Sequence, residues 1–453
     1  MTALPSMWLA TCGDDLTPRP ALAGDTSCDV AIVGAGFTGL WTAWHLLHHD
    51  PSLRVLVLER EIAGWGASGR NGGWCSALFA ASWSRVAAEH GRAAALALRR
   101  ALERTVDDVA TWCETYDVDA DLAKGGTLTL ARGPAQVGRV RGHVEEDRAA
   151  GGTDTVWLDA GAAAQRIRAT GVDGAAYTPH CAAIQPAKLV RGIARRAEDL
   201  GAHIHEQTRV RAIEPGRVRT DRGIVRADVV VQATEGYTAD LDGGGRALAP
   251  VWSLIVATEP MPAEVWAQLG WRHRETLTDG RHLIIYAQRT ADGRLVFGGR
   301  GAPYRFGSRT SGTRGHDRTY QRLEEELRAM FPPLRDVRVD HRWGGVLGVP
   351  RDWMPSVGVD RATGFAWGGG YVGDGVGCSA LAGKTLADLV LDRDTDDTHL
   401  AWVGHRWPDW EREPLRWAGV RGVGVLMASA DRVEARTGRP ARRAALLSRL
   451  VGE

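Results

Sequence analysis

The first clear pattern along the chain is an apolar run that ends in glycines and leads into a helical repeat. Residues 29–33 are mostly aliphatic, which is typical of a buried strand. From residue 40 to residue 49 apolar side chains recur three and four positions apart, which predicts a helix. Residues 53–59 form a second aliphatic run that ends in Glu59. The pattern therefore predicts a strand–turn–helix–strand unit near the start of the chain.

The turn of this unit has the form G-x-G-x-x-G. Gly34 permits a tight turn, Gly36 lets a pyrophosphate approach the backbone, and Gly39 lets the helix pack closely on the strand. The helix N-terminus attracts phosphate charge, and Glu59 can accept hydrogen bonds from both hydroxyls of an adenosine ribose. The alternative is a glycine-rich turn without a ligand. We favour dinucleotide binding, through Gly34, Gly36, Phe37, Thr38, Gly39, Glu59 and Arg60.

Two more glycine-rich loops distinguish FAD from NAD(P). One occupies residues 64–73, directly after the second strand, and the other occupies residues 368–377 and leads into a helix with apolar spacing. A helix N-terminus preceded by glycines is a second site for negative charge. One pyrophosphate needs only one such turn, so the later loop fits the N1–C2=O edge of a reduced flavin. The cofactor that we predict is FAD.

The rest of the chain alternates between helical and strand patterns. Helices are predicted over 78–116, with Gly91 as a weak point, and over 187–200, where Pro186 opens the first turn. A strand is predicted over 126–131, and short strands over 203–205, 208–214, 217–220 and 229–231. Residues 251–345 predict a mixed antiparallel sheet that serves as a substrate platform, with strands at 253–258, 283–288, 295–298 and 338–342 and a helix at 319–330.

Composition narrows the class of protein. The 453 residues are 44% hydrophobic and carry a net charge of +1, so no global positive field attracts nucleic acid or a membrane surface. Six scattered cysteines include no C-x-x-C pair, and we expect no metal site. The first fifteen residues have no secretory pattern, and no apolar run reaches the length of a membrane span. We therefore expect a cytoplasmic protein.

Several motifs together resemble one family. They are G-A-G-F-T-G, G-W-G-A-S-G-R-N-G-G (64–73), I-Q-P-A-K-L-V-R-G (184–192), A-T-E-G-Y-T (233–238), A-T-E-P (257–260), L-V-F-G-G (295–299) and the loop at 368–377. In this order they resemble the D-amino-acid oxidase superfamily of FAD-dependent amine oxidoreductases, which includes glycine and sarcosine oxidases. Within it the chain is most similar to the gamma-glutamylputrescine oxidase-like branch.

The resemblance implies an α/β architecture with two domains interleaved along the chain. A Rossmann-type FAD-binding domain would take 1–78, 185–245 and 346–400, the substrate domain 79–184 and 246–345, and a C-terminal helical extension 401–453. Further FAD contacts would come from Ser68, Gly69, Arg70, Asn71, Gly72, Gly73, Val210, Ala233, Thr234, Gly373, Asp374, Gly375, Val376 and Gly377. In the extension, Trp402, Trp407, Trp410 and Trp417 are interpreted as packing anchors rather than as an aromatic binding surface, and helices are expected over 426–450.

The implied activity is oxidation of the C–N bond of an amine. Hydride transfer from the amine α-carbon to flavin N5 needs positioning rather than an acid–base pair. Trp74, Tyr286 and Trp343 are the candidate pocket walls. The reoxidant would be oxygen or another electron acceptor.

Three departures from the family pattern refine this expectation. Gly345 replaces the cysteine that binds flavin covalently in sarcosine oxidases, so we expect non-covalent FAD. Leu347 and Gly377 replace an arginine and a lysine that hold a substrate carboxylate, which argues against a simple α-amino acid. Two alternatives stay open: a flavin-binding subunit of a larger dehydrogenase, or an oxidase of an amino acid or aminophosphonate that uses Arg300, Arg342 or Arg351.

Overall fold

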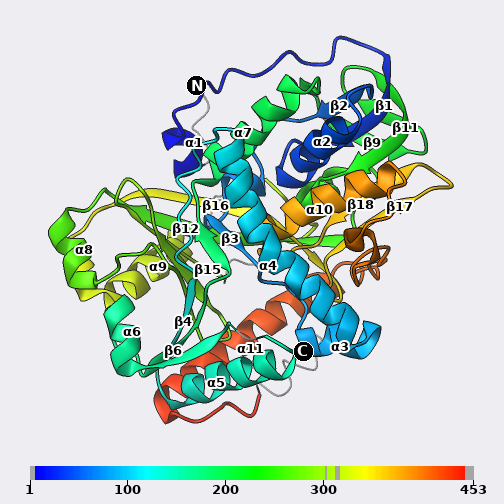
Figure 1. Cartoon of the computed structure of the whole chain (residues 1–453). Helices are drawn as coiled ribbons and strands as arrows, with labels where there is room; N and C mark the ends of the chain where they lie inside the picture. The colour runs from blue at the N-terminus through cyan, green and yellow to red at the C-terminus, as the bar shows by residue number, and fades with distance from the viewer. Residues whose placement is uncertain (1–5, 153, 301–303, 312–316, 444–453) are drawn as a thin grey trace.

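Two large sheets, each covered by helices, form the body of the molecule (Figure 1). The computed structural model describes residues 6–152, 154–300, 304–311 and 317–443. The expected α/β architecture is confirmed. No helix in these ranges is long and apolar enough to cross a membrane.

The first sheet has a parallel centre. Strands β8, β2, β1, β11 and β18 lie side by side in that order, and β17 pairs antiparallel with β18 at the edge. Strands β9 and β10 extend from β11 as an antiparallel ribbon. The bounds are β1 Thr26–Val33, β2 Val55–Leu58, β8 His203–His205, β9 Val210–Glu214, β10 Arg217–Thr220, β11 Ile224–Gln232, β17 Ser356–Asp360 and β18 Phe365–Gly369.

Helices cover this sheet because their apolar stripes face its aliphatic strands. Leu40 and Leu47 of the first long helix are buried in the same apolar core as the side chains of β1 and β2. A smaller apolar core on the other face lies under the β9–β10 ribbon. The helices are α2 Phe37–His49, α3 Trp83–His90, α4 Arg92–Thr115, α7 Pro186–Asp199 and α10 Gly375–Val390. The single helix expected over 78–116 is thus two helices, since Gly91 adopts φ +90° between them.

The second sheet is mostly antiparallel, as expected for a substrate platform. Its order is β16-β12-β15-β14-β13-β4-β6-β5, with one parallel pair, β13 and β4. The bounds are β4 Thr127–Ala131, β5 Val156–Asp159, β6 Gly174–Thr178, β12 Leu248–Thr258, β13 Thr276–Asp279, β14 Ile285–Arg289, β15 Leu295–Arg300 and β16 Val339–Pro350. Strand β16 runs across the boundary proposed between residues 345 and 346.

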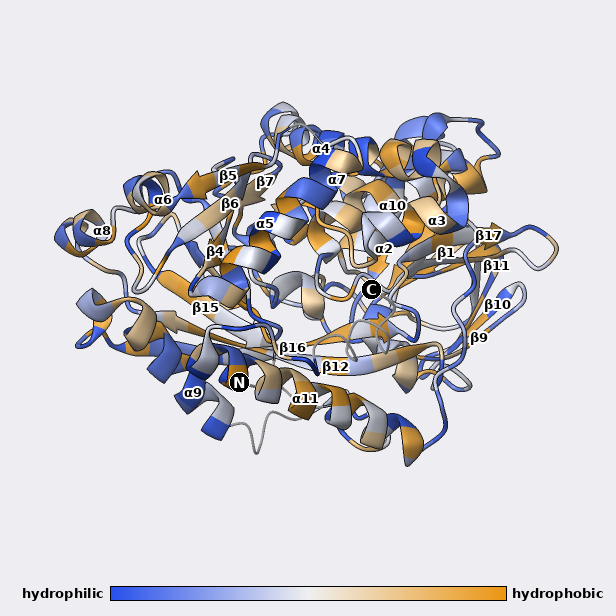
Figure 2. Ribbon diagram, turned by 90° about the horizontal axis from the view of Figure 1, so that it is seen from below, coloured by the Kyte–Doolittle hydropathy of each residue, from blue (hydrophilic) through white to orange (hydrophobic). Residues whose placement is uncertain are grey.

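Helices lie along the outer faces of this sheet. These are α5 Pro134–Ala149, α6 Ala160–Arg166, α8 Ala263–Leu269, α9 Asp317–Met330 and α11 Leu415–Thr437. Figure 2 shows α9 and α11 along the same side of the strands β12 and β16. Helix α11 begins earlier than the expected 426, and residues 444–450 of that expectation lie outside the described ranges.

Short elements connect the two sheets and the tail. Helix α1 (Met7–Thr11) buries Trp8 beside Trp343 at the junction of the sheets, and β3 (Trp74–Ser76) pairs with β7 (Cys181–Ala183). The remaining turns are η1 Ala67–Gly69, η2 Glu235–Asp240, η3 Pro332–Leu334 and η4 Asp396–His399. In the tail, Trp402 is fully buried and Trp410 is 9% exposed, consistent with packing anchors.

Candidate functional site

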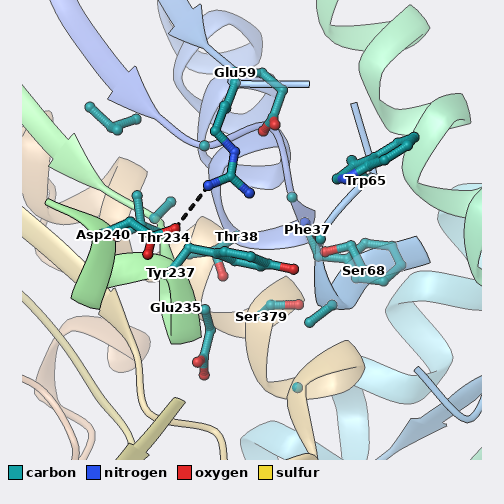
Figure 3. Close-up of a pocket in the computed structure, with 18 of the residues that line it drawn as sticks. Phe37, Thr38, Glu59, Trp65, Ser68, Thr234, Glu235, Tyr237, Asp240 and Ser379 are labelled. Atoms are coloured by element: carbon teal, nitrogen blue, oxygen red, sulfur yellow. Dashed lines mark hydrogen bonds and ion pairs between the residues drawn. The ribbon is translucent and has the colours of Figure 1, made fainter. Parts of the chain in front are cut away.

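A long cavity crosses the carboxyl ends of the first sheet and reaches the second sheet (Figure 3). Its lining comes from the β1–α2 turn, the end of β2, η1, η2 and the start of α10. Ligands of open parallel sheets bind at this edge, where the strand ends and helix N-termini converge. The cavity is therefore in the place where the sequence predicts the dinucleotide.

The β1–α2 turn brings its backbone to the cavity because its glycines have neighbours where a side chain would be. Gly34 has φ +107°, and a Cβ there would lie 2.6 Å from the carbonyl oxygen of Ala233. A Cβ on Gly36 would lie 2.9 Å from the hydroxyl of Ser68, which accepts a hydrogen bond from the Phe37 N–H at 2.8 Å. The first turn of α2 thus presents its N-terminus to the cavity, as a pyrophosphate requires.

Glu59 is held in place by the backbone on both sides of it. Its carboxylate accepts hydrogen bonds from the N–H of Ala35 at 3.0 Å and from the N–H of Glu61 at 2.9 Å. Burial raises the pKa of Glu59, while these two bonds act to lower it. The carboxylate lines the cavity with acceptor capacity left for ribose hydroxyls.

Beside Glu59 lies a polar and aromatic wall, of which only Arg60 was predicted from the sequence. Arg60 forms an ion pair with Asp240 at 2.8 Å, and its guanidinium lies 5.1 Å from the ring centre of Tyr237. Trp65, on the opposite side in Figure 3, also lines the cavity. Such rings can stack on a planar heterocycle. The sequence analysis did not predict the other residues of this wall as cofactor contacts, because η2 approaches β2 only in the folded chain.

Glu235 joins three distant segments at the floor of the cavity. It accepts hydrogen bonds from the N–H of Gly348 at 2.6 Å and from the N–H of Tyr371 at 2.9 Å. The hydroxyl of Tyr371 lies 2.9 Å from that of Thr38, so the loop before α10 is tied to the start of α2. Burial raises the pKa of Glu235 to about 7, in spite of these backbone donors. Sequence reasoning marked its neighbours 233 and 234 but missed Glu235 itself.

The structure distributes the predicted FAD contacts over three places. The long cavity is lined by Gly34, Gly36, Phe37, Thr38, Glu59, Arg60, Ser68, Asn71, Val210, Ala233, Thr234, Gly373, Gly375 and Val376. Arg70, Gly72 and Asp374 line a second cavity beside it. Gly39, Gly69, Gly73 and Gly377 line neither cavity; their missing side chains let backbone segments pack closely.

The second cavity, of about 220 Å³, lies between the loop 64–73, the start of α10 and the second sheet. Trp74 and Tyr286 line it with their rings edge to face, 6.4 Å apart. The Tyr286 hydroxyl is 2.8 Å from the hydroxyl of Ser253. Five residues line both cavities: Ala67, Asn71, Leu347, Gly373 and Val376. The two cavities therefore adjoin at the N-terminus of α10.

Trp343 is placed differently from the expectation. It does not line this cavity; it is 3% exposed and packs edge to face on Trp8. Its indole N–H donates to the carbonyl oxygen of Arg70 at 3.0 Å, and that of Trp8 donates to the carbonyl oxygen of Asn71 at 2.8 Å. Trp343 is on the same face of β16 as Gly345 and Leu347, which line the cavity. Trp8 and the loop 64–73 cover this face at Trp343, so the indole supports the loop instead of lining the cavity.

Two of the arginines considered for a substrate anion, Arg342 and Arg351, pair with glutamates outside this cavity. Arg342 pairs with Glu324 at 2.6 Å and Arg351 pairs with Glu411 at 3.0 Å, and neither lines the second cavity. The side chain of Arg300 lies outside the described part of the structure. Arg70 does line the cavity, where its Nε donates to the carbonyl oxygen of Trp65 at 2.8 Å.

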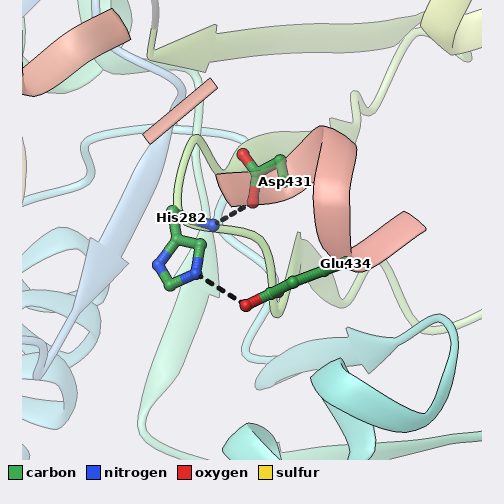
Figure 4. A group of neighbouring side chains, drawn as sticks. All are labelled: His282, Asp431 and Glu434. Atoms are coloured by element: carbon green, nitrogen blue, oxygen red, sulfur yellow. Dashed lines mark hydrogen bonds and ion pairs between the residues drawn. The ribbon is translucent and has the colours of Figure 1, made fainter. Parts of the chain in front are cut away.

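One side-chain group in the described residues has the spacing of a metal site, at the far end of the second sheet. His282, Asp431 and Glu434 approach one another there (Figure 4). Asp431 accepts hydrogen bonds from the backbone N–H groups of His282 and Leu283, and Arg139 donates to Glu434 at 2.6 Å. Both carboxylates thus have hydrogen-bond donors, and the Arg139 guanidinium supplies the positive charge beside Glu434. We therefore interpret these three side chains as the attachment of α11 to the second sheet.

The fold and the long cavity define a dinucleotide-binding α/β protein, and the residues fit FAD. The Gly34–Thr38 turn would hold the pyrophosphate, Glu59 the ribose, and the N-terminus of α10 the flavin edge. The comparison with protein families agrees. Residues 29–389 match the family described as FAD dependent oxidoreductase, and the chain belongs to that family. It is an FAD-dependent oxidoreductase.

Known relatives cover most of the chain. Gamma-glutamylputrescine oxidoreductase of Escherichia coli (strain K12) is 29% identical over 397 residues, which span 86% of this chain and 90% of the relative. Glycine oxidase of Geobacillus kaustophilus (strain HTA426) is 26% identical over 382 residues, which span 81% of this chain and 94% of the relative.

Solved structures show the same fold. The crystal structure of glycine oxidase from Geobacillus kaustophilus superposes with a TM-score of 0.67 at 22% identity, over 82% of this chain and 96% of that one. The crystal structure of L-proline dehydrogenase from P. horikoshii gives 0.67 at 19% identity, over 84% and 95%.

Proposed function

We propose that this protein oxidises the C–N bond of an amine that lacks an α-carboxylate. FAD, when bound, accepts the hydride from the amine α-carbon, and water then hydrolyses the imine. The observation that carries the proposal is the junction of the two cavities at the start of α10, where an aromatic pocket adjoins the predicted position of the flavin. The names of the relatives, which include an oxidoreductase of an amine, support the same reaction class.

The chemistry of the pocket suits hydride transfer. Among the described residues that line it, Arg70 and Asp374 are the charged ones, and none is histidine. Trp74 and Tyr286 provide two rigid walls, and the Ser253–Tyr286 hydrogen bond fixes one of them. Such walls hold the α-carbon against the flavin, which is what this reaction requires of the protein.

The choice of amine over amino acid rests on the charges at the pocket. Leu347 presents an apolar side chain where relatives are expected to hold a carboxylate, and Asp374 adds a carboxylate of the protein itself. Arg342 and Arg351 are paired with glutamates away from the pocket. A substrate carboxylate would have Arg70 as its cationic partner and would lie in the same pocket as Asp374.

The reoxidant and the compartment belong to the same proposal. Oxygen or another acceptor takes the electrons from the reduced enzyme. The described structure contains six buried cysteines, all unpaired, which supports a reducing compartment such as the cytoplasm.

The test compares substrates that differ only in the carboxylate. Pentylamine and norleucine have the same side chain, and anaerobic bleaching of the flavin reports reduction by each. We expect pentylamine to bleach the flavin and both enantiomers of norleucine to react at least tenfold more slowly. Faster bleaching by either norleucine would show that the pocket accepts α-amino acids and would contradict the proposal.

A further inference from the structure

A large cavity lies under helix α11 and borders the second cavity, which is lined by Trp74 and Tyr286 and which we call the catalytic pocket. It has a volume of about 870 Å³, about four times that of the pocket at Trp74 and Tyr286. Its walls come from the second sheet, α9 and α11. Leu347 and Ile284 line both cavities. We call this larger space the α11 chamber.

The floor of the α11 chamber continues the floor of the catalytic pocket. In the β12–β16 pair, Ser253 lies opposite Gly345 and both line the pocket. Two residues further along, Val251 lies opposite Leu347, and both line the chamber. Residues two apart on a strand point to the same face, about 7 Å from each other. A molecule lying along this face passes directly from one cavity into the other.

Helix α11 spans the chamber while being attached at its two ends. At its start, Arg416 donates to the carbonyl oxygen of Gly245 at 2.6 Å. Near its end, Asp431 and Glu434 hold the segment around His282 (Figure 4). Only three of its 23 residues are buried: Arg416, Ala430 and Glu434. Its middle turns therefore line the chamber, and at its start Trp417 and Val420 pack on the apolar cluster around Val349.

The face of α11 toward the chamber is apolar and small. It carries Gly419, Val420, Val423, Gly424 and Met427, which recur three and four positions apart. Val425 also lines the chamber and is 64% exposed, which is high for a large aliphatic side chain. Binding of an apolar ligand to such a surface is favourable, because it removes apolar area from water.

The charged groups around the α11 chamber are largely paired. Arg281 forms an ion pair with Glu326 at 3.1 Å, and Arg351 forms one with Glu411 at 3.0 Å. Arg421 lies over the ring of Trp417 at 5.1 Å. Apart from Arg322, His282 and Thr319, most of the remaining lining consists of aliphatic and aromatic side chains. It suits a hydrocarbon chain better than a second charged group.

We propose that the α11 chamber binds the distal part of the substrate, and that the substrate is an amine with an extended apolar chain. This inference rests on the proposed amine oxidation and specifies its substrate class. The matched family segment ends at residue 389, so α11 lies beyond it. The chamber is formed in part by a segment outside the family pattern and gives this chain its specificity.

The experiment measures flavin reduction by n-alkylamines from ethylamine to octylamine with the complete holoenzyme. We expect kcat/KM to rise about two- to fourfold per added methylene. A flat series would overturn the inference and leave amine oxidation standing.

Two matched variants test whether the alkyl chain of the substrate lies in the α11 chamber. A Cβ on Gly424 or on Gly422 would meet no atom within 4 Å, but only Gly424 lines the chamber. We expect Gly424→Phe to abolish the rise in kcat/KM for hexylamine and longer amines, while kcat/KM for ethylamine is unchanged. In Gly422→Phe we expect kcat/KM to rise along the whole series as in the wild type. Gly419→Phe, also in the chamber lining, repeats the test at a second position. Equal losses in Gly424→Phe and Gly422→Phe would overturn the proposal.

A binding measurement separates the chamber from the reaction. The anaerobically reduced holoenzyme cannot oxidise an amine, so titration calorimetry reports binding alone. We expect hexylamine to bind at least tenfold more tightly than ethylamine, and the preference to disappear in Gly424→Phe. If this holds while no amine bleaches the oxidised flavin, the chamber stands and the proposed function fails. If Gly424→Phe instead changes only the sedimentation of the protein, the face contacts a second copy and the inference is wrong.

Discussion

Glu59 illustrates at the scale of one residue how the site is arranged for its ligand by the backbone. Two N–H groups hold its carboxylate at the edge of the long cavity. The motif spacing was sufficient to find Glu59, because the acid at the end of the second strand is part of a local pattern. It was insufficient for Glu235 and Trp343, whose positions depend on contacts with segments more than a hundred residues away.

The first prediction concerns Glu59. Glu59→Gln removes the charge from a hydrogen bond to the ribose and should cost about 1.5–3 kcal/mol of FAD affinity, or about ten- to a hundredfold in Kd. Quenching of flavin fluorescence during titration measures Kd. Glu61→Gln is the matched control, since Glu61 does not line the cavity. An unchanged Kd in Glu59→Gln would remove this carboxylate from the FAD site.

The second prediction concerns the pH dependence that Glu235 introduces. Its pKa is raised to about 7 in the folded chain, against 4.5 as its ordinary value. Between these values the folded state keeps a proton that the unfolded chain has lost, so the free energy of unfolding falls as pH rises. Relative to Glu235→Gln, which does not titrate, the wild type should lose about 2–3 kcal/mol between pH 4.5 and 7.5. Urea unfolding of both proteins at a fixed FAD concentration measures the free energy of unfolding at each pH. The same pH dependence in the wild type and in Glu235→Gln would contradict the prediction.

At the scale of elements, the N-termini of α2 and α10 form the site together. The hydrogen bond between Thr38 and Tyr371 connects the two helices at their starts. Both helices were predictable because their apolar spacing is regular. The sequence marked Gly91 only as a weak point of one helix. The short elements α1, α8 and β13 were not predicted, because tertiary packing rather than local pattern decides them.

The third prediction separates two glycines at the start of α10. A Cβ on Gly377 would overlap the carbonyl oxygen of Ser76 in β3, whereas one on Gly375 would lie 3.3 Å from the Tyr371 side chain. Gly377→Ala should therefore displace the helix start, lower the free energy of unfolding by about 1–3 kcal/mol and lower the flavin reduction potential. Urea unfolding and redox titration measure the two effects. We expect smaller effects for Gly375→Ala; the reverse order would mean that α10 does not approach the flavin through this contact.

At the scale of the whole molecule, the two sheets meet along the cavities, and the chain passes between them several times. The helical and strand patterns predicted the strand–turn–helix–strand unit and a mixed antiparallel sheet, and the resemblance to the family implied that two domains are interleaved along the chain. It did not predict the α11 chamber, since the space under a helix depends on where its ends are attached, and those attachments join residues 282 and 431.

The fourth prediction is that the whole protein holds FAD without a covalent bond. Gly345 lines the catalytic pocket where a cysteine would be needed, and Cys75 and Cys378 are fully buried and line neither of the two cavities. Precipitation of the holoenzyme with acid should leave a yellow supernatant and a colourless pellet. Absorbance at the flavin bands in the redissolved pellet would contradict this.

The strand order of the first sheet has a consequence for synthesis. Strands β1 and β2 emerge from the ribosome first, but their neighbours β11 and β18 follow about 200 and 340 residues later. Glu235, Tyr371 and the start of α10 complete the cavity only after this late segment has been made. A nascent chain that carries the complete G-x-G-x-x-G turn therefore has no pocket for FAD. Cofactor loading follows translation of at least five sixths of the chain, and the supply of free FAD acts on the finished polypeptide rather than on its early folding.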